Sequence, residues 1–176
     1  MATPADKTIL IVDDEPDVQR YFQRLLEDAG FTVVTASNGQ EALESVQSKA
    51  PDFISLDLVM PEKSGIRFFH ELRRNREWSR IPVVIVTAHA SDEFGKQDIN
   101  DIMQNTTVSG PELYLEKPVK PQHYVNTVKK ILGLPTEDEV IEEEDVLRSE
   151  LEGLVKGADA KKLQEALKAL KDKPGN

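Results

Sequence analysis

Five short segments of this chain carry side chains that could act together on a phosphoryl group. They are Asp13-Asp14, Asp57, Met60-Pro61 with Gly65, Thr87-Ala88 and Lys117-Pro118. Three carboxylates, one hydroxyl and one ammonium group would suit a magnesium ion and a phosphoryl group, with one aspartate as the nucleophile. Each segment follows or ends an apolar run that predicts a buried strand. We therefore expect these side chains to meet at one edge of a sheet.

The apolar runs alternate with helical patterns along the first 134 residues. We predict strands at 8–12, 31–36, 53–56, 81–87 and 113–117, and helices from Asp14 to Gly30 and around 42–46, 66–72, 92–104 and 124–132. Five alternations of strand and helix favour a doubly wound parallel α/β sheet. Right-handed crossovers then place ligand chemistry at the carboxyl ends of the strands. Asp14 is expected to cap the first helix, with Pro16 in its first turn.

Composition limits the classes of protein to consider. The 176 residues are 39% hydrophobic and 31% charged, which is typical of a globular protein. There is no cysteine, so disulfides and thiolate chemistry are excluded. The sequence shows no signal-peptide pattern and no apolar run long enough for a bilayer, so we expect a cytoplasmic protein without membrane contact. The net charge of -10 disfavours direct DNA binding.

The pattern changes after Leu134. Residues 135–145 are acidic, and apolar residues then recur at helical spacing over 146–155 and 163–170. Amphipathic helices must bury their apolar faces against the preceding domain, each other or another chain. We therefore divide the chain into a domain at 6–134 and an acidic linker with a helical tail at 135–176. A solvated extension is the alternative for the tail, and the chain could also be part of a longer protein.

The segments, in this order and at these strand ends, resemble the receiver domain of two-component response regulators across residues 6–134. Tyr114, three residues before Lys117, belongs to the matching pattern. The resemblance implies a flavodoxin-like five-stranded sheet of strand order 2-1-3-4-5, here with a C-terminal helical extension. It also implies that Asp57 is the phosphoacceptor, and that Lys117 and the Thr87 hydroxyl contact phosphoryl oxygens.

The same resemblance implies a magnesium site. Asp14, Asp57 and the backbone carbonyl of Val59 would hold the ion, with Asp13 acting through water. Each residue also has a simpler interpretation. Asp13-Asp14 could serve merely as a helix cap, Thr87 could be a strand-end hydroxyl with a hydrogen-bond partner, and Lys117 could be a surface charge. Asp57 is different, because a carboxylate that closes a buried strand needs a lysine or a cation nearby.

Three further roles follow from the resemblance. Thr87 and Tyr114 would form a switch in which the aromatic ring moves inward when Thr87 moves toward the phosphoryl group. Val59 and His89 would modulate the lifetime of the phosphorylated form, although His89 could equally be a solvated loop residue. The stretch between Thr87 and Lys117 is several residues longer than in a typical receiver. The helix predicted at 92–104, and the output face to which it belongs, therefore need not match those of the family.

The leading hypothesis is therefore a phosphorylation-controlled switch rather than an enzyme with its own substrate. A histidine kinase or phosphotransfer protein would supply the phosphoryl group. A downstream protein or a second copy would bind the face of the fourth helix, fifth strand and fifth helix, or the C-terminal helices. The alternatives are a phosphorylation-independent scaffold and an aspartyl-phosphate phosphatase. The phosphatase needs a carboxylate two residues after its nucleophile, where this chain has Val59.

Overall fold

A computed structural model describes residues 3–61, 64–88, 111 and 113–136 of the protein. The chain divides into two compact units, Met1–Leu134 and Pro135–Asn176, and the fold below is that of the first. The helices predicted at 92–104, 146–155 and 163–170, and the residue His89, lie outside the described residues.

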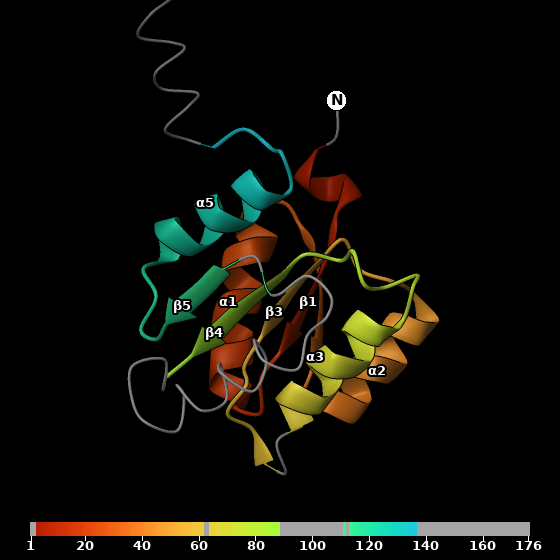
Figure 1. The fold of residues 1–176 in the computed structure, drawn as a ribbon. Coiled ribbons are helices and arrows are strands. Elements are labelled where there is room, and N and C mark those ends of the chain that lie inside the picture. The colour runs from red at the N-terminus through yellow and green to blue at the C-terminus, as the bar shows by residue number, and fades with distance from the viewer. Residues whose placement is uncertain (1–2, 62–63, 89–110, 112, 137–176) are drawn as a thin grey trace, which may run out of the picture. The chain divides into compact units, whose positions relative to one another are not determined.

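Strands and helices alternate along the first unit (Figure 1). In chain order the elements are η1 (Pro4–Asp6), β1 (Thr8–Val12), α1 (Pro16–Asp28), β2 (Thr32–Ala36), α2 (Gly39–Ser48), β3 (Phe53–Leu56), α3 (Ser64–Arg74), β4 (Val83–Thr87), β5 (Leu113–Glu116) and α5 (Pro121–Ile131). The strands pair in the order β2-β1-β3-β4-β5, and every pairing is parallel. The predicted fold class and strand order are confirmed.

Some element ends differ from the prediction by one or two residues. β2 starts one residue later than predicted, and β5 ends one residue earlier. β4 starts at Val83 rather than at residue 81, because Pro82 has no N–H to donate to the ladder. The Pro82 carbonyl still accepts a hydrogen bond from the Ile54 N–H at 3.0 Å, and Lys117 N–H donates to the Thr87 carbonyl at 3.0 Å. The hydrogen-bonded pattern thus extends slightly beyond the strands.

The prediction that Asp14 caps α1 is wrong. The helix begins at Pro16, and its N-cap is Glu15, with an extended backbone at φ -90° and ψ 111°. Proline favours the first position of a helix and pushes the residue before it toward an extended conformation, so the cap falls on Glu15. The start of the helix therefore does not need Asp14 as its cap.

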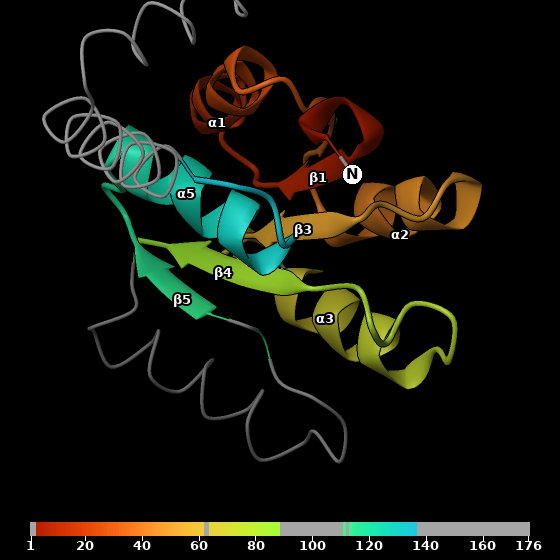
Figure 2. The ribbon, with the colours of Figure 1, turned by 90° about the horizontal axis from the view of Figure 1, so that it is seen from above.

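The sheet lies between two layers of helices (Figure 2). Alternate residues of β1 point to opposite faces: Ile9 and Ile11 pack with buried residues of α1 and α5, and Leu10 and Val12 pack with those of α2 and α3. All five residues of β1 are buried, as are all of β3 and β4. Burial on both faces explains why these strands are continuous apolar runs in the sequence.

Two glycines allow the ends of α2 and α3 to approach the sheet closely. A Cβ atom at Gly65, in the first turn of α3, would overlap the carbonyl oxygen of Asp57. A Cβ atom at Gly39, at the start of α2, would overlap the carbonyl oxygen of Ser64. The N-terminal ends of both helices and the loop after β3 are thus in backbone contact, which only glycine permits at these positions.

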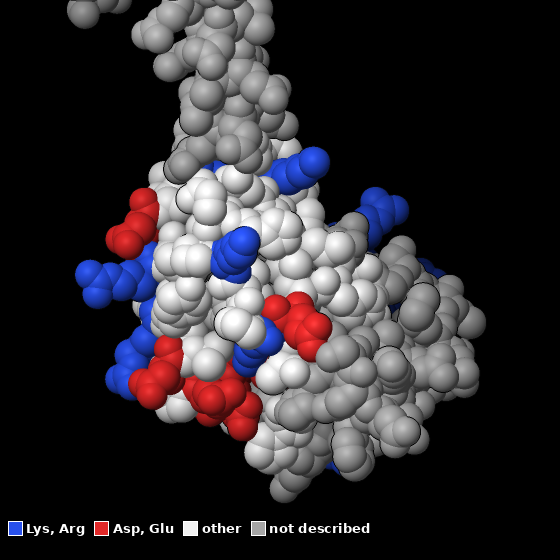
Figure 3. All heavy atoms as spheres, turned by 90° about the vertical axis from the view of Figure 1, so that its left-hand side faces the viewer, with Lys and Arg blue, Asp and Glu red and all other residues white. Residues whose placement is uncertain are grey.

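The described surface carries both signs of charge. On the side that Figure 3 shows, basic and acidic side chains are interspersed over the described part. None of the described helices has the length and apolar character needed to cross a membrane.

Candidate functional site

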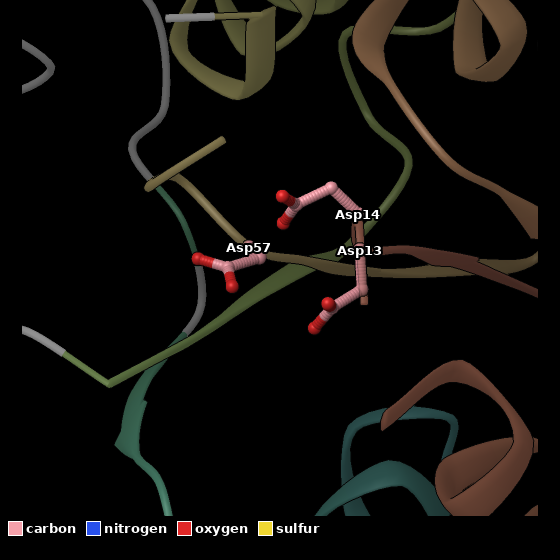
Figure 4. Close-up of side chains that lie close together, drawn as sticks. All are labelled: Asp13, Asp14 and Asp57. Atoms are coloured by element: carbon pink, nitrogen blue, oxygen red, sulfur yellow. The ribbon is translucent and has the colours of Figure 1, made fainter. Parts of the chain in front are cut away.

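The ends of the central strands bring three carboxylates together (Figure 4). Asp13 and Asp14 directly follow β1, and Asp57 directly follows β3. These two strands are neighbours in the sheet, with Val12 paired to Leu56, so the residues after them lie side by side. One carboxylate oxygen from each of Asp13, Asp14 and Asp57 lies within 4.8 Å of the others.

Lys117 joins two of these carboxylates. Its ammonium nitrogen lies 2.6 Å from Asp13 Oδ2 and 2.8 Å from Asp57 Oδ2. The side chain of Lys117 is 13% exposed, against 4% for Asp13 and 6% for Asp57. The buried carboxylate after β3 thus has the cationic partner that its burial requires, and Lys117 is not a surface charge.

Backbone amides fix the other oxygen of each of these two carboxylates. Val59 N–H donates to Asp57 Oδ1 at 2.9 Å, and Glu15 N–H donates to Asp13 Oδ1 at 3.0 Å. In both cases the donor lies two residues after the aspartate, which is the local turn that aspartate favours. Asp14, by contrast, makes no hydrogen bond or ion pair within the described part of the chain. It is the member of the cluster most free to bind a ligand.

Burial and hydrogen bonding shift the pKa values of Asp57 and Lys117. Burial raises the pKa of Asp57 above its ordinary value, and the hydrogen bond from Lys117 only partly opposes this effect. Burial alone would lower the pKa of Lys117, but its hydrogen bonds to Asp13 and Asp57 outweigh that effect and raise the pKa. The lysine is therefore held in its charged form at neutral pH.

The donor set suits a magnesium ion. Magnesium prefers hard oxygen ligands and is commonly bound by one or two carboxylates together with water and phosphate oxygens. Asp14 and Asp57 offer such oxygens, and Asp13 lies within the same cluster. The exposed Val59 follows Asp57 by two residues, and its proposed carbonyl ligand stays a prediction. The residues present thus fit the ion that the sequence resemblance implies.

Thr87 and Tyr114 lie on the face of the sheet that carries α2 and α3. Thr87 ends β4 and shares its alternation with Val83 and Ile85, which pack in the cluster below α2 and α3. Tyr114 packs against the same cluster, and its buried hydroxyl has no hydrogen-bond partner among the residues that the structure describes. Burial raises the pKa of that hydroxyl. The two residues predicted to form the switch therefore lie on a common face, with Thr87 1% exposed.

Sequence reasoning missed three polar side chains near the site. Gln19 in α1 donates from its side-chain amide to the backbone carbonyl of Asp13. Ser55, two residues before Asp57, and Tyr124 in α5 are both buried. Tyr124 packs in the cluster beneath α1 and α5. A serine within the apolar run 53–56 could have drawn attention to this position. A glutamine on an amphipathic helix gives no comparable signal.

Comparison with known proteins agrees with this geometry. The sequence model of the response regulator receiver domain matches residues 9–129, which is more than half of the chain. The chain belongs to this family. The match lies within the receiver predicted at residues 6–134, and the residues after 129 lie outside it.

Two kinds of relative resemble this receiver over nearly their whole length. The polar-differentiation response regulator DivK of Brucella anthropi is 34% identical over 127 residues, which are 72% of this chain and 97% of that protein. The chemotaxis protein CheY4 of Vibrio cholerae has a TM-score of 0.61 at 29% identity, covering 73% of this chain and 98% of that one. A putative response regulator from Chloroflexus aurantiacus has a TM-score of 0.62 at 31% identity, covering 72% and 98%.

Proposed function

We propose that this receiver accepts a phosphoryl group on Asp57 and thereby switches a protein-interaction surface. The observation that carries the proposal is the buried Lys117 ammonium group between Asp57 and Asp13, beside a third carboxylate from Asp14. A lysine and a divalent cation together would neutralise the charge of an incoming phosphoryl group. Phosphoryl transfer depends mainly on such neutralisation and on positioning.

The donor would be a phosphohistidine on a sensor histidine kinase or a phosphotransfer protein. One Asp57 oxygen attacks the phosphorus atom and forms an acyl phosphate, while the P–N bond breaks and its electron pair stays on the imidazole nitrogen. Lys117, already hydrogen-bonded to Asp57 Oδ2, would contact a phosphoryl oxygen after transfer. The bond from Val59 N–H leaves the Asp57 carboxylate with a fixed orientation.

Magnesium would neutralise phosphoryl charge in this site. Asp14 and Asp57 would bind the ion directly and Asp13 through water, with the Val59 carbonyl as a further ligand. Hydrolysis of the acyl phosphate would return the protein to its resting form, with Val59 and His89 affecting the access of water. The protein would then catalyse only its own phosphorylation and dephosphorylation.

The switch would connect Asp57 with Thr87 and Tyr114. The Thr87 hydroxyl would bind a phosphoryl oxygen, and Tyr114 would then take an inward position. The unpartnered hydroxyl of Tyr114 supports this idea, because a buried donor without an acceptor weakens the preference of the ring for its present place. The new surface would bind a downstream protein or a second copy through the side that includes β5 and α5, or through the C-terminal residues.

The test is the intact mass of the protein after incubation with acetyl phosphate, with and without magnesium. We expect one phosphoryl adduct that requires both magnesium and Asp57, and therefore none in Asp57→Asn. The adduct should be stable in acid and labile in base, as an acyl phosphate is.

A missing adduct has two explanations, which a beryllofluoride titration separates. Binding of beryllofluoride with magnesium would show that the site works and that hydrolysis outpaces detection. Failure of both reagents would reject the proposal and favour a receiver-fold scaffold that acts without phosphorylation.

A further inference from the structure

One side-chain amide beside the site contacts three acceptors from two loops. The Nε2 atom of Gln19 lies 2.5 Å from the Asp13 carbonyl oxygen, 3.1 Å from the Ala36 carbonyl oxygen and 3.1 Å from Ser37 Oγ. Gln19 is in the second turn of α1, and Ala36 ends β2. An amide group has two hydrogens, so these three acceptors share them. The shortest contact is the one to Asp13.

That contact fixes the peptide group between the two aspartates. The Asp13 carbonyl belongs to the peptide unit that joins Asp13 to Asp14, and a peptide unit is planar. On the other side of Asp13, its N–H donates to the Ala36 carbonyl at 3.1 Å. Gln19 donates to the same Ala36 carbonyl, so both sides of Asp13 are tied to the end of β2.

Fixing this peptide group fixes the directions of both carboxylates. Asp13 points to the ammonium group of Lys117, while Asp14 has no side-chain partner within the described residues to hold it in place. The orientation of Asp14 therefore depends on its backbone. A rotation of the peptide before it would move its carboxylate away from the oxygens of Asp13 and Asp57.

We propose that Gln19 is a positioning residue for the metal site, acting through the backbone of Asp13 and Asp14. This inference rests on the proposed function for its biological meaning, but not for its physical test. Groups that orient metal ligands typically change metal affinity about 10–100-fold when they are removed. Because Gln19 acts on the backbone of a partly exposed site, we expect an effect near the lower end, about 10-fold.

The main variant is Gln19→Met, which keeps the length of the side chain and removes the donor. The matched control is Gln23→Met, one turn later on the same helix, where the glutamine amide donates to the surface residue Glu27 at 2.7 Å and to no other described residue. Calorimetric titration with magnesium gives the Kd of each protein. We expect Gln19→Met to weaken binding about 10-fold and Gln23→Met to leave it within about twofold of wild type.

Two further measurements distinguish an effect of Gln19 on the orientation of Asp14 from an effect on the stability of the contact between α1 and the loops. The backbone amide resonance of Asp14 should shift in Gln19→Met and not in Gln23→Met. With acetyl phosphate, the half-saturating magnesium concentration should rise, while the rate at saturating magnesium stays near that of wild type. A lower melting temperature with an unchanged Kd for magnesium would overturn the proposal, and so would equal weakening in both variants.

A second variant keeps the test decisive if Gln19→Met does not fold. Gln19→Glu preserves shape and polarity but cannot donate, and its added negative charge would by itself strengthen binding of a cation. Weaker magnesium binding in Gln19→Glu would therefore support the proposal strongly, and a backbone amide resonance of Asp14 that stays at its wild-type position would overturn it. If wild type binds magnesium but takes no phosphoryl group, the proposed function fails while this comparison stands.

Discussion

At the scale of single residues, the same substitution at the two ends of β3 should have opposite effects on stability. Asp52 precedes the strand and Asp57 follows it. Asp52 accepts hydrogen bonds from the Lys7 ammonium group at 3.0 Å and the Thr8 N–H at 2.8 Å, near the surface. Asp57 is buried in the acidic site. The surroundings of Asp52 in the folded state stabilise its ionised form, whereas the burial of Asp57 destabilises its ionised form.

For Asp57→Asn we expect higher stability in the absence of divalent cations. Burial raises the pKa of Asp57 in the folded state, so the ionised form costs stability, and this cost appears as the pH rises from 3.8 through the raised value. The gain at pH 7 should appear as a higher melting temperature of the variant than of wild type. Thermal unfolding in a chelating buffer measures it. A lower melting temperature in the variant would contradict the prediction.

For Asp52→Asn we expect a loss of stability that depends on pH in the other sense. Burial by itself would raise the pKa of Asp52, but the hydrogen bonds from Thr8 and Lys7 lower it overall. The stabilisation is therefore present above the ordinary value of 3.8 and disappears as the pH falls through the lowered value. Because the side chain is 34% exposed, the effect at pH 7 should not exceed about 1 kcal/mol. Urea unfolding of both proteins at pH 7 and pH 3 would show whether the difference shrinks in acid.

Tyr124 offers a further test of buried polarity. Its side chain is fully buried against Phe22, with ring centroids 4.4 Å apart, and its hydroxyl has no hydrogen-bond partner in the described part of the chain. Removing an unpartnered buried hydroxyl removes its desolvation cost, so Tyr124→Phe should be neutral or stabilising by up to about 1–3 kcal/mol. Chemical unfolding measures the change. Destabilisation would mean that the hydroxyl has an acceptor, for which the neighbouring Ser55 is the candidate.

At the scale of elements, the contact between α3 and the loop after β3 should depend on glycine. Gly65→Ala places a methyl group against the Asp57 carbonyl, so either α3 or Asp57 must move. We expect a loss of about 1–3 kcal/mol in stability and slower phosphorylation by acetyl phosphate.

Gly133→Ala is the control, because it has open space around it but a positive φ of 66°. It should cost about 1–2 kcal/mol without changing the phosphorylation rate. Equal phosphorylation rates in both variants would show that the close approach at Gly65 is unrelated to the site.

The elements also show which parts of the structure are predictable from sequence. The continuous apolar runs of β1, β3 and β4 predict burial on both faces, and parallel pairing then brings Asp13, Asp57 and Lys117 to one edge. Exact strand ends were less predictable, because they depend on local features such as the missing N–H of Pro82. The role of Gln19 could not be predicted, since its acceptors come from loops that only the fold brings together.

At the scale of the whole molecule, the receiver should work without the C-terminal residues. The first compact unit ends at Leu134, so a deletion that begins at residue 137 leaves it whole. We expect deletion of 137–176 to leave magnesium-dependent phosphorylation intact and to change the oligomeric state or the binding of a downstream partner. Light scattering and phosphorylation assays on both lengths would test this. Unchanged assembly and unchanged partner binding would instead make the segment a passive extension.

The division of the buried side chains by the sheet has a genetic consequence. Ile9, Ile11 and Tyr124 pack in the cluster beneath α1 and α5, whereas Leu10, Val12 and Leu72 pack in the cluster beneath α2 and α3. Substitutions in contact couple energetically, while distant ones add. Among these core residues, substitutions on the same face of the sheet should therefore couple, and substitutions on different faces should add. A suppressor of a damaging change at Tyr124 should arise among its packing neighbours, and not beneath α3.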